Sequence, residues 1–174
     1  MLNTLAVQAK FPRREPLARI HGDVESNPDN YDRDGKQLSA KRLVPQTIMI
    51  YKGLQVYLTR NKRKDLDFIN GMQCTVEDYD DKIPAVRVLT ATGHRLAITS
   101  SPDEKLGNMR YFPMRYGYAS TIMKFAGATL DRVCIWLDRP YVPGAAYTAM
   151  SRVRMQEHCL IGGCVKPEHF TPAR

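Results

Sequence analysis

The sequence lacks several features that would define a membrane protein, a secreted protein or a self-sufficient enzyme. No apolar run approaches the roughly 18 residues that a membrane helix needs. The first ten residues lack the basic start and long apolar core of a secretory signal. No GxxxxGKS or GxxxxGKT phosphate-binding loop occurs, and the GxSxG, HExxH and paired-carboxylate patterns are also missing. We therefore expect no membrane partner and no independent binding of a nucleoside triphosphate.

Cysteine is scarce: the four residues form no CxxC pair and have no histidine at zinc-ligand spacing. His158 precedes Cys159, but two adjacent ligands without further partners do not make a metal site. Cys134 and Cys159 adjoin apolar runs, as small buried thiols do. This pattern predicts no metal site and a reducing, intracellular compartment. Nucleus and mitochondrion both stay open.

Acidic residues are outnumbered, because 26 Lys and Arg stand against 18 Asp and Glu, which gives a net charge of +8 and a pI near 9.4. The excess lies toward the two ends of the chain, since residues 61–110 hold eight charges of each sign. Such a balance favours polyanionic partners without naming one. A charge that serves only solubility is an equally open reading.

Residues 1–42 show little apolar periodicity and are interrupted by three prolines. We expect them to form a polar, poorly packed arm. From Thr47 onward, short β-rich or alternating runs recur, separated by turn signals such as Asn70-Gly71. Short strands at this spacing predict a small antiparallel barrel of the SH3-like kind. The runs cover residues 47–51, 54–59, 72–78, 85–90 and 94–99.

The last third of the chain has a different pattern. A short strand is expected at residues 116–120 and a buried strand at residues 132–137. Residues 144–153 predict a helix of about three turns, and residues 159–161 predict another strand. Strand, helix and strand in this order predict a piece of parallel α/β sheet, whose ligands usually lie at the carboxyl ends of the strands.

Two segments of this last third carry candidate phosphate ligands. Arg152 lies at the end of the predicted helix, where a guanidinium could clamp a phosphate or satisfy the last carbonyls of the helix. The segment after the predicted 116–120 strand offers the Thr121 and Thr129 hydroxyls and the Lys124 ammonium. Gly127 would permit close approach of the backbone. A solvent-exposed lysine in a turn would look the same, so both readings stay open.

A basic run over residues 60–64 is flanked by aromatic residues, a mixture typical of proteins that bind single strands. Within this run, Arg60, Asn61 and Lys62 are the candidate nucleic-acid contacts. A solvated hairpin loop would have the same composition, and that reading also stays open.

Three stretches of the sequence together resemble the motifs of one known family. Residues 53–61 (GLQVYLTRN) and 67–72 (DFINGM) resemble the G-x-x-V-x-L-x-x-N and D-F-x-N-G block of superfamily-1B DNA helicases of the PIF and RecD type. Residues 119–129 (ASTIMKFAGAT) resemble its motif V, commonly A-x-T-I-H-K-x-Q-G-x-T. Residues 147–153 (YTAMSRV) resemble its motif VI, Y-V-A-L-S-R-V. The order and the spacing of the three also match, and the resemblance covers residues 43–164.

The resemblance implies the C-terminal part of such a helicase, in which a second RecA-like domain carries an inserted SH3-like module. The fold class is then α/β, with a partial RecA-like parallel sheet and a small SH3-like β-barrel. Residues 43–52 and 111–174 would form the RecA-like part and residues 53–110 the inserted module. Arg152 would be the arginine finger that reaches the γ-phosphate of ATP held by the other RecA-like domain. The remaining implied roles are single-stranded DNA contacts for Thr121, Lys124, Gly127 and Thr129, and a structural turn for Asn70 and Gly71.

ATP and Mg²⁺ would bind only together with the N-terminal RecA-like domain, and we expect this chain alone not to hydrolyse ATP. Three residues depart from the family pattern. Met123 stands where the family usually has His, Ala126 where it has Gln, and Ala145 where Gln often precedes the motif VI helix. These departures predict weaker coupling between the DNA and nucleotide sites.

Two functions from different classes stay open. The resemblance favours the C-terminal part of an ATP-dependent DNA helicase, with the 5′→3′ polarity that the family implies. The charge of +8 and the altered motif V favour a non-catalytic nucleic-acid-binding module derived from a helicase. A protein-interaction SH3-like domain is disfavoured, because Tyr57, Tyr79 and Trp136 are too scattered in the sequence to predict an aromatic groove.

Overall fold

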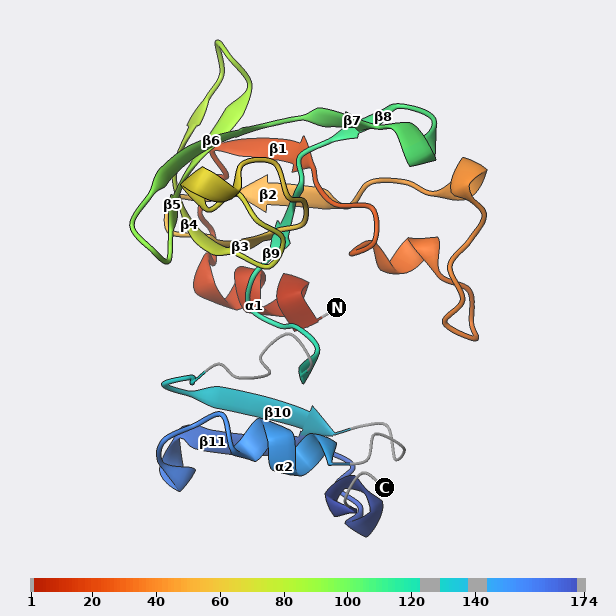
Figure 1. The fold of residues 1–174 in the computed structure, drawn as a ribbon, viewed down its shortest axis with the longest axis vertical. Coiled ribbons are helices and arrows are strands. Elements are labelled where there is room, and N and C mark those ends of the chain that lie inside the picture. The colour runs from red at the N-terminus through yellow and green to blue at the C-terminus, as the bar shows by residue number, and fades with distance from the viewer. Residues whose placement is uncertain (1, 123–128, 138–143, 172–174) are drawn as a thin grey trace. The chain divides into compact units, whose positions relative to one another are not determined.

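The computed structural model describes residues 2–122, 129–137 and 144–171 (Figure 1). These residues form two compact units, one within residues 1–119 and one within residues 120–174. Each unit has an apolar core of its own and is described by itself. Among the described residues, no helix is long and apolar enough to cross a membrane.

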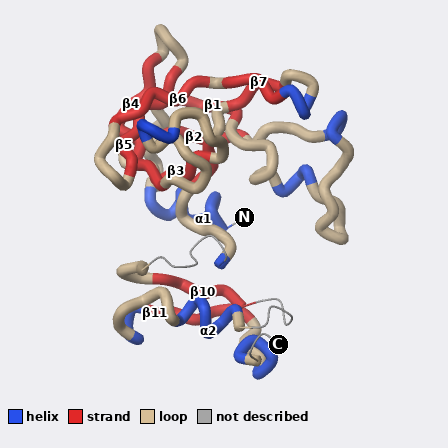
Figure 2. Tube along the Cα trace, viewed as in Figure 1, coloured by secondary structure: helices blue, strands red, loops and turns tan. Residues whose placement is uncertain are grey.

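A five-stranded antiparallel sheet lies at the centre of the first unit (Figure 2). Its strands are β3 (Gln55–Leu58), β4 (Gln73–Asp80), β5 (Ala85–Thr90), β6 (Arg95–Thr99) and β9 (Met114–Tyr116). They follow the order β6-β5-β4-β3-β9. In β6, Leu96 and Ile98 are buried while their neighbours are exposed, which is the alternation that the sequence shows.

The expected closed barrel is not found in the described part of the chain, because the edge strands β6 and β9 do not pair with each other. Strand β9 also begins and ends earlier than the predicted strand at residues 116–120. The chain leaves the sheet after Gly117, and the main chain of residues 118 and 119 binds the side chain of Asn3 instead of a neighbouring strand.

Residues 31–42 are largely exposed, but residues 2–24 pack into this unit, so the prediction of a poorly packed arm does not hold for that part. They form α1 (Leu2–Lys10) and β1 (Ala18–His21), and β1 pairs with β2 (Thr47–Ile50). Their apolar side chains are widely spaced along the chain, so no local period reveals that Val7, Phe11 and Ile20 share one core, while Val24 packs in a separate small cluster. The buried apolar side chains of this segment are Val7, Phe11, Ile20 and Val24.

A short ribbon leaves the sheet after β6. It consists of β7 (Ser101–Asp103) and β8 (Met109–Tyr111), which pair antiparallel and are joined by a single 3₁₀ turn. Tyr111 is buried in a small cluster with Val24 and Leu43, so the ribbon packs on residues from the N-terminal segment.

The boundary between the two units differs from the predicted domain boundary. The sequence predicts residues 43–52 and 111–119 to belong with the RecA-like part, whereas β2 pairs with β1 and β9 pairs with β3 inside the first unit. The assignment of a RecA-like domain with an inserted module stays a prediction.

The second unit contains a two-stranded parallel sheet of β10 (Val133–Leu137) and β11 (Cys159–Gly163). Between these strands the chain forms α2 (Ala145–Met150), shorter than the predicted helix over residues 144–153. Ala146 and Ala149 of α2 pack on Ile135 and Leu137 of β10. The predicted strand–helix–strand order is therefore present, and the whole molecule is mixed α/β.

Candidate functional site

Arg152 lies one residue beyond the C-terminal cap of α2. Its Nε donates to the carbonyl oxygen of Thr148 at 3.0 Å, and its Nη2 donates to Oγ of Ser151 at 2.8 Å. The carbonyls of a last helical turn lack partners within the helix, so Nε satisfies one of them. This contact fits the helix-end role that the sequence left open for Arg152. It also sets the direction of the half-buried guanidinium.

The segments that resemble motifs V and VI meet through their main chains. The amide of Leu130 donates to the carbonyl of Arg152 at 2.7 Å, and Leu130 forms a parallel bridge with Val153. Thr129, the last residue of the first segment, is therefore adjacent in sequence to a residue that is bonded to Arg152. The two segments are about 20 residues apart in the sequence, and no local pattern predicts that their ends meet.

Arg152 lies at the amino ends of the parallel strands, and not at the carboxyl ends where ligands of such sheets usually bind. Leu130 and Val153 both precede their strands, β10 and β11. The reason is topological, because a crossover helix runs back antiparallel to its strands and its last residues return to the amino edge. A ligand of Arg152 would therefore approach this amino edge.

The structure describes only some of the other residues of the motif V-like segment. Thr121 and Thr129 are both exposed. Lys124 and Gly127, together with the departures Met123 and Ala126, lie outside the described residues. Ala145, the third departure, is the first residue of α2, so no side-chain amide is present at the start of that helix.

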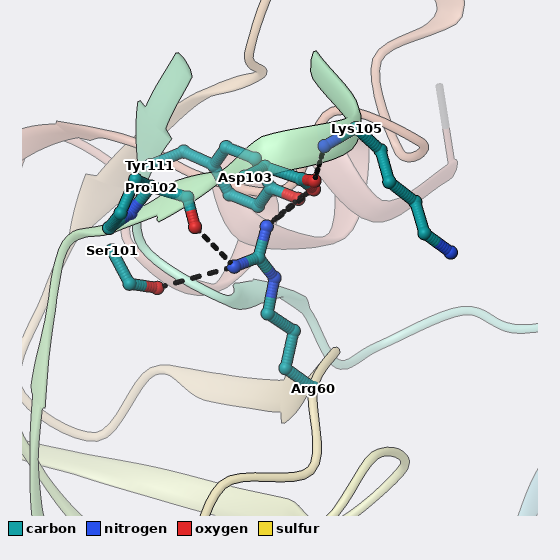
Figure 3. A network of polar contacts seen from close by, with 6 residues as sticks. All are labelled: Arg60, Ser101, Pro102, Asp103, Lys105 and Tyr111. Carbon is teal, nitrogen blue, oxygen red and sulfur yellow. Dashed lines mark hydrogen bonds and ion pairs between the residues drawn. The ribbon is translucent and has the colours of Figure 1, made fainter. Parts of the chain in front are cut away.

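Arg60, predicted as a nucleic-acid contact, lies inside a polar network of the first unit (Figure 3). Its Nη2 donates to the Asp103 carboxylate at 2.5 Å and to the Tyr111 hydroxyl at 2.6 Å. Its Nη1 donates to the carbonyl of Pro102 at 2.9 Å. The guanidinium also lies 4.6 Å from the centre of the Tyr111 ring, within cation–π range. Arg60 therefore attaches the β7–β8 ribbon to the end of β3.

The charges and hydroxyl of this network change one another's pKa values. Burial opposes the charge of Arg60, but the bonds to Tyr111 and Asp103 outweigh it and raise the pKa of Arg60. Burial and the Asp103 contact raise the pKa of Tyr111 to about 12. Burial would also raise the pKa of Asp103, yet the bonds from Tyr111 and Arg60 lower it below its usual value. The network therefore holds a charged pair bridged by a neutral phenol.

The rest of the basic run forms a folded loop. Oδ1 of Asn61 accepts a hydrogen bond from the Asn70 amide at 2.7 Å, and the Gly71 amide donates to the Leu58 carbonyl at 2.8 Å. Gly71 has a φ of +88°, which favours glycine. Lys62 is exposed, with Nζ 5.5 Å from the centre of the Phe68 ring. Lys62 and Asn61 thus lie on the loop surface, whereas Arg60 does not.

Sequence reasoning missed the group that ties this loop to the sheet. The Asp67 carboxylate accepts from the Thr92 hydroxyl at 2.5 Å and lies 2.8 Å from Nδ1 of His94. These contacts lower the pKa of Asp67, the Thr92 bond most and the His94 bond next. Asp67 has a φ of +59°. The Thr92-Gly93 turn signal marks where the partners lie, but no local pattern links them to residue 67.

No cluster of three or more metal-ligating side chains gathers within the described residues. The second unit has an open hollow of about 460 Å³. It is lined by Arg132, Val133, Cys134, Glu157, His158 and Leu160. The neighbours His158 and Cys159 thus contribute only the histidine to this surface.

The chain is similar in sequence to curated helicases, although no family model matches it. It is 27% identical over 160 residues to the ATP-dependent DNA helicase PIF1 of Danio rerio, across 88% of this chain and 24% of that protein. It is 29% identical over 136 residues to the ATP-dependent DNA helicase Pif1 of Bdellovibrio bacteriovorus, across 75% of this chain and 31% of that protein. The chain thus spans less than a third of the length of these relatives.

Solved structures show the same relationship at the level of fold. The structure of two coordinating Pif1 helicases at forked dsDNA matches with a TM-score of 0.71 and 18% identity, over 99% of this chain and 39% of that chain. Pif1 from Bacteroides, in complex with ADP-AlF3 and ssDNA, matches with a TM-score of 0.65 and 16% identity, over 99% of this chain and 41% of that chain. In sequence and in fold, the chain therefore corresponds to a C-terminal part of Pif1-type helicases.

Proposed function

We propose that this chain supplies part of the second motor domain of an ATP-dependent DNA helicase of the Pif1 type. The observation that carries the proposal is the main-chain pairing of Leu130 with Arg152 and Val153, because it brings the end of the motif V-like segment, one residue before Leu130, next to the motif VI-like segment. One segment would contact single-stranded DNA and the other the nucleotide. The five-stranded sheet and the β7–β8 ribbon would then correspond to the inserted SH3-like module.

In this role Arg152 acts as an arginine finger that contacts the γ-phosphate of ATP. The ATP and its Mg²⁺ are bound by an N-terminal RecA-like domain. The nucleotide supplies the γ-phosphoryl group that is transferred to water. A planar guanidinium can donate two hydrogen bonds to phosphate oxygens and stabilise the charge that develops on them. The bond from Nε to Thr148 supports this role, because it orients the side chain at the end of a packed helix.

The DNA contacts of this proposal come from both units. Exposed hydroxyls at Thr121 and Thr129 can donate to phosphate oxygens of a single strand, and Lys62 can add an ammonium from the loop surface. Asn61 stays a candidate beside it. Arg60 enters only indirectly, because its guanidinium already binds Asp103 and Tyr111. Lys124 and Gly127 complete the set through the resemblance to motif V.

The test uses the chain reconstituted with the N-terminal RecA-like domain of a Pif1-type helicase, with Arg152→Ala compared against Arg154→Ala. Arg154 is exposed and lies two residues away, so it controls for loss of positive charge. We expect Arg152→Ala to reduce ATP turnover by a factor of at least about 10³ while single-stranded DNA affinity stays nearly unchanged. Equal losses of turnover and of DNA affinity would instead make Arg152 a DNA contact or a structural residue.

A second candidate function is a non-catalytic nucleic-acid-binding module. The net charge of +8 and the Met123 and Ala126 departures of the motif V-like segment favour it. Binding would then be largely electrostatic. Its affinity would fall steeply as the salt concentration rises, because binding releases counterions from the nucleic acid and that release is less favourable at high salt. Steep salt dependence, together with no stimulation of ATP turnover by DNA in the reconstituted protein, would select this function. In either case the isolated chain should not hydrolyse ATP, and turnover above background by the pure chain would contradict both.

A further inference from the structure

Asn3 binds the main chain of two residues at the end of the first unit. Its Oδ1 accepts from the Tyr118 amide at 2.9 Å and from the Ala119 amide at 2.6 Å. Its Nδ2 donates to the Ala119 carbonyl at 2.9 Å. One side chain thus replaces the neighbouring strand that residues 118 and 119 would need to satisfy these main-chain groups.

Helix α1, which carries Asn3, is firmly attached to the same unit. Val7 and Phe11 are buried in its core, and the Phe11 ring stacks on Tyr51 with centroids 4.8 Å apart. Nζ of Lys10 lies 5.1 Å from the centre of the Tyr118 ring. The helix therefore presents Asn3 from a fixed support, beside the chain that leaves β9 (Figure 1).

Two tyrosines hold the preceding residues. The Tyr116 hydroxyl accepts from the Met49 amide at 2.8 Å, and the Tyr118 hydroxyl accepts from the Gln55 amide at 3.1 Å. Gly117 approaches the Gln55 backbone so closely that a methyl group there would lie about 3.0 Å from it. These side chains hold residues 116–118 from one side, and Asn3 alone holds the main chain of residue 119 among the described hydrogen bonds.

We propose that Asn3 is a latch: a positioning residue that orders the junction at residues 118–119, where the first unit ends, through three hydrogen bonds from the N-terminal helix. When the three hydrogen bonds are formed, the main chain of residues 118 and 119 is held in one position just before Ser120 and Thr121. When they are broken, the junction becomes flexible while α1 stays folded. Helix α1, which lies within the predicted arm of residues 1–42, thereby controls the order of the first residue of the motif V-like segment. This inference does not depend on what the second unit binds.

Amide hydrogen exchange measured by NMR on the full chain tests the latch. The variants are Asn3→Ala, Asn3→Asp and, as a control on the same helix, Gln8→Ala, since Gln8 is exposed. In Asn3→Ala we expect the Tyr118 and Ala119 amides to exchange at least tenfold faster. The Phe11 amide, which donates to the Val7 carbonyl, reports whether α1 itself has unfolded and should be unchanged. Asn3→Asp keeps the acceptor for both amides but sets a carboxylate oxygen against the Ala119 carbonyl, so its exchange rates should lie between those of wild type and Asn3→Ala.

Limited digestion with chymotrypsin gives an independent measurement, because Tyr118 is a cleavage residue inside the latched segment. Cleavage of the Tyr118–Ala119 bond, identified by fragment mass, should be several-fold faster in Asn3→Ala and unchanged in Gln8→Ala. Unchanged exchange and cleavage in Asn3→Ala would overturn the proposal. Faster exchange at Phe11 to the same extent as at Ala119 would also overturn it, since Asn3 would then only stabilise its own helix.

Discussion

The Arg60 guanidinium donates to the Asp103 carboxylate at 2.5 Å, although the two residues are 43 positions apart in the sequence. Both side chains are largely shielded from solvent, with 24% and 19% of their surfaces exposed. Tyr111 bridges them, donating to Asp103 at 2.7 Å and accepting from Arg60 at 2.6 Å. A residue that the sequence predicts to contact nucleic acid is therefore bound within the protein.

Replacing Arg60 with alanine should destabilise the first unit. The substitution leaves the Asp103 carboxylate without its charged partner, at a cost of about 1–2 kcal/mol after allowance for solvent screening. Urea unfolding measures this cost. Arg63→Ala is the matched control, because Arg63 forms its ion pair with Asp65 on the exposed surface, where solvent screens it, and should change stability much less than Arg60→Ala. Equal effects of the two substitutions would contradict the role of the network.

Tyr111 should make stability fall in alkaline solution. Its pKa is raised to about 12 by burial and by the Asp103 contact, whereas an unfolded tyrosine ionises near pH 10. The neutral phenol is favoured in the folded state, so its contribution is complete below about pH 10 and disappears as the pH rises to about 12. Unfolding of wild type and Tyr111→Phe should therefore differ most at pH 9 and converge toward pH 12. A difference that does not change over this range would contradict the assignment.

Asp67 should make the loop over residues 60–71 sensitive to acid. Hydrogen bonds from Thr92 and His94 lower its pKa in the folded state, so the contribution is complete above the unfolded value of about 3.9. It is lost as the pH falls from that value through the lowered folded pKa. Asp67→Asn tests this with little strain, since asparagine tolerates a positive φ. NMR titration of the Asp67 carboxylate should give a midpoint below the unfolded value of about 3.9, and a midpoint at or above that value would contradict the role of the Thr92 and His94 contacts.

Gly163 should be far less tolerant of substitution than other glycines with a positive φ. Its φ is +89°, and a methyl group there would meet the main-chain carbonyl of Leu137. Gly93 has a φ of +94° but open space around it. Gly93→Ala should therefore cost about 1–2 kcal/mol for the backbone conformation alone, and Gly163→Ala should cost more and separate β10 from β11. Thermal unfolding followed by NMR signals of each unit would measure both, and equal costs would argue against the close approach.

The sequence predicts most strands of the first unit, because their β-rich or alternating runs are local. Thr47–Ile50 and Ala85–Thr90 form strands where the pattern places them, whereas β9 begins and ends before the predicted strand. It fails where the ordering contact is distant. The apolar residues Val7, Phe11 and Ile20 share no period, and their common core becomes apparent only when β1 pairs with β2.

The candidate site shows the same division. The resemblance identifies the motif V-like and motif VI-like segments in the sequence. In the structure, Leu130, the residue after the first segment, is hydrogen-bonded to Arg152 of the second. No local signal distinguishes Arg60, whose partners lie on the β7–β8 ribbon, from Lys62 on the loop surface. Composition alone treats these two cations alike.

The amide–carbonyl bond between Leu130 and Arg152 has a mechanical consequence. A displacement of the preceding threonine by a bound strand would pull on the peptide group of the arginine itself, with no intervening side chain to relax. Under the proposed function, the positions of the bound strand and of Arg152 would then be coupled through one main-chain hydrogen bond, which no substitution of Leu130 other than proline would remove.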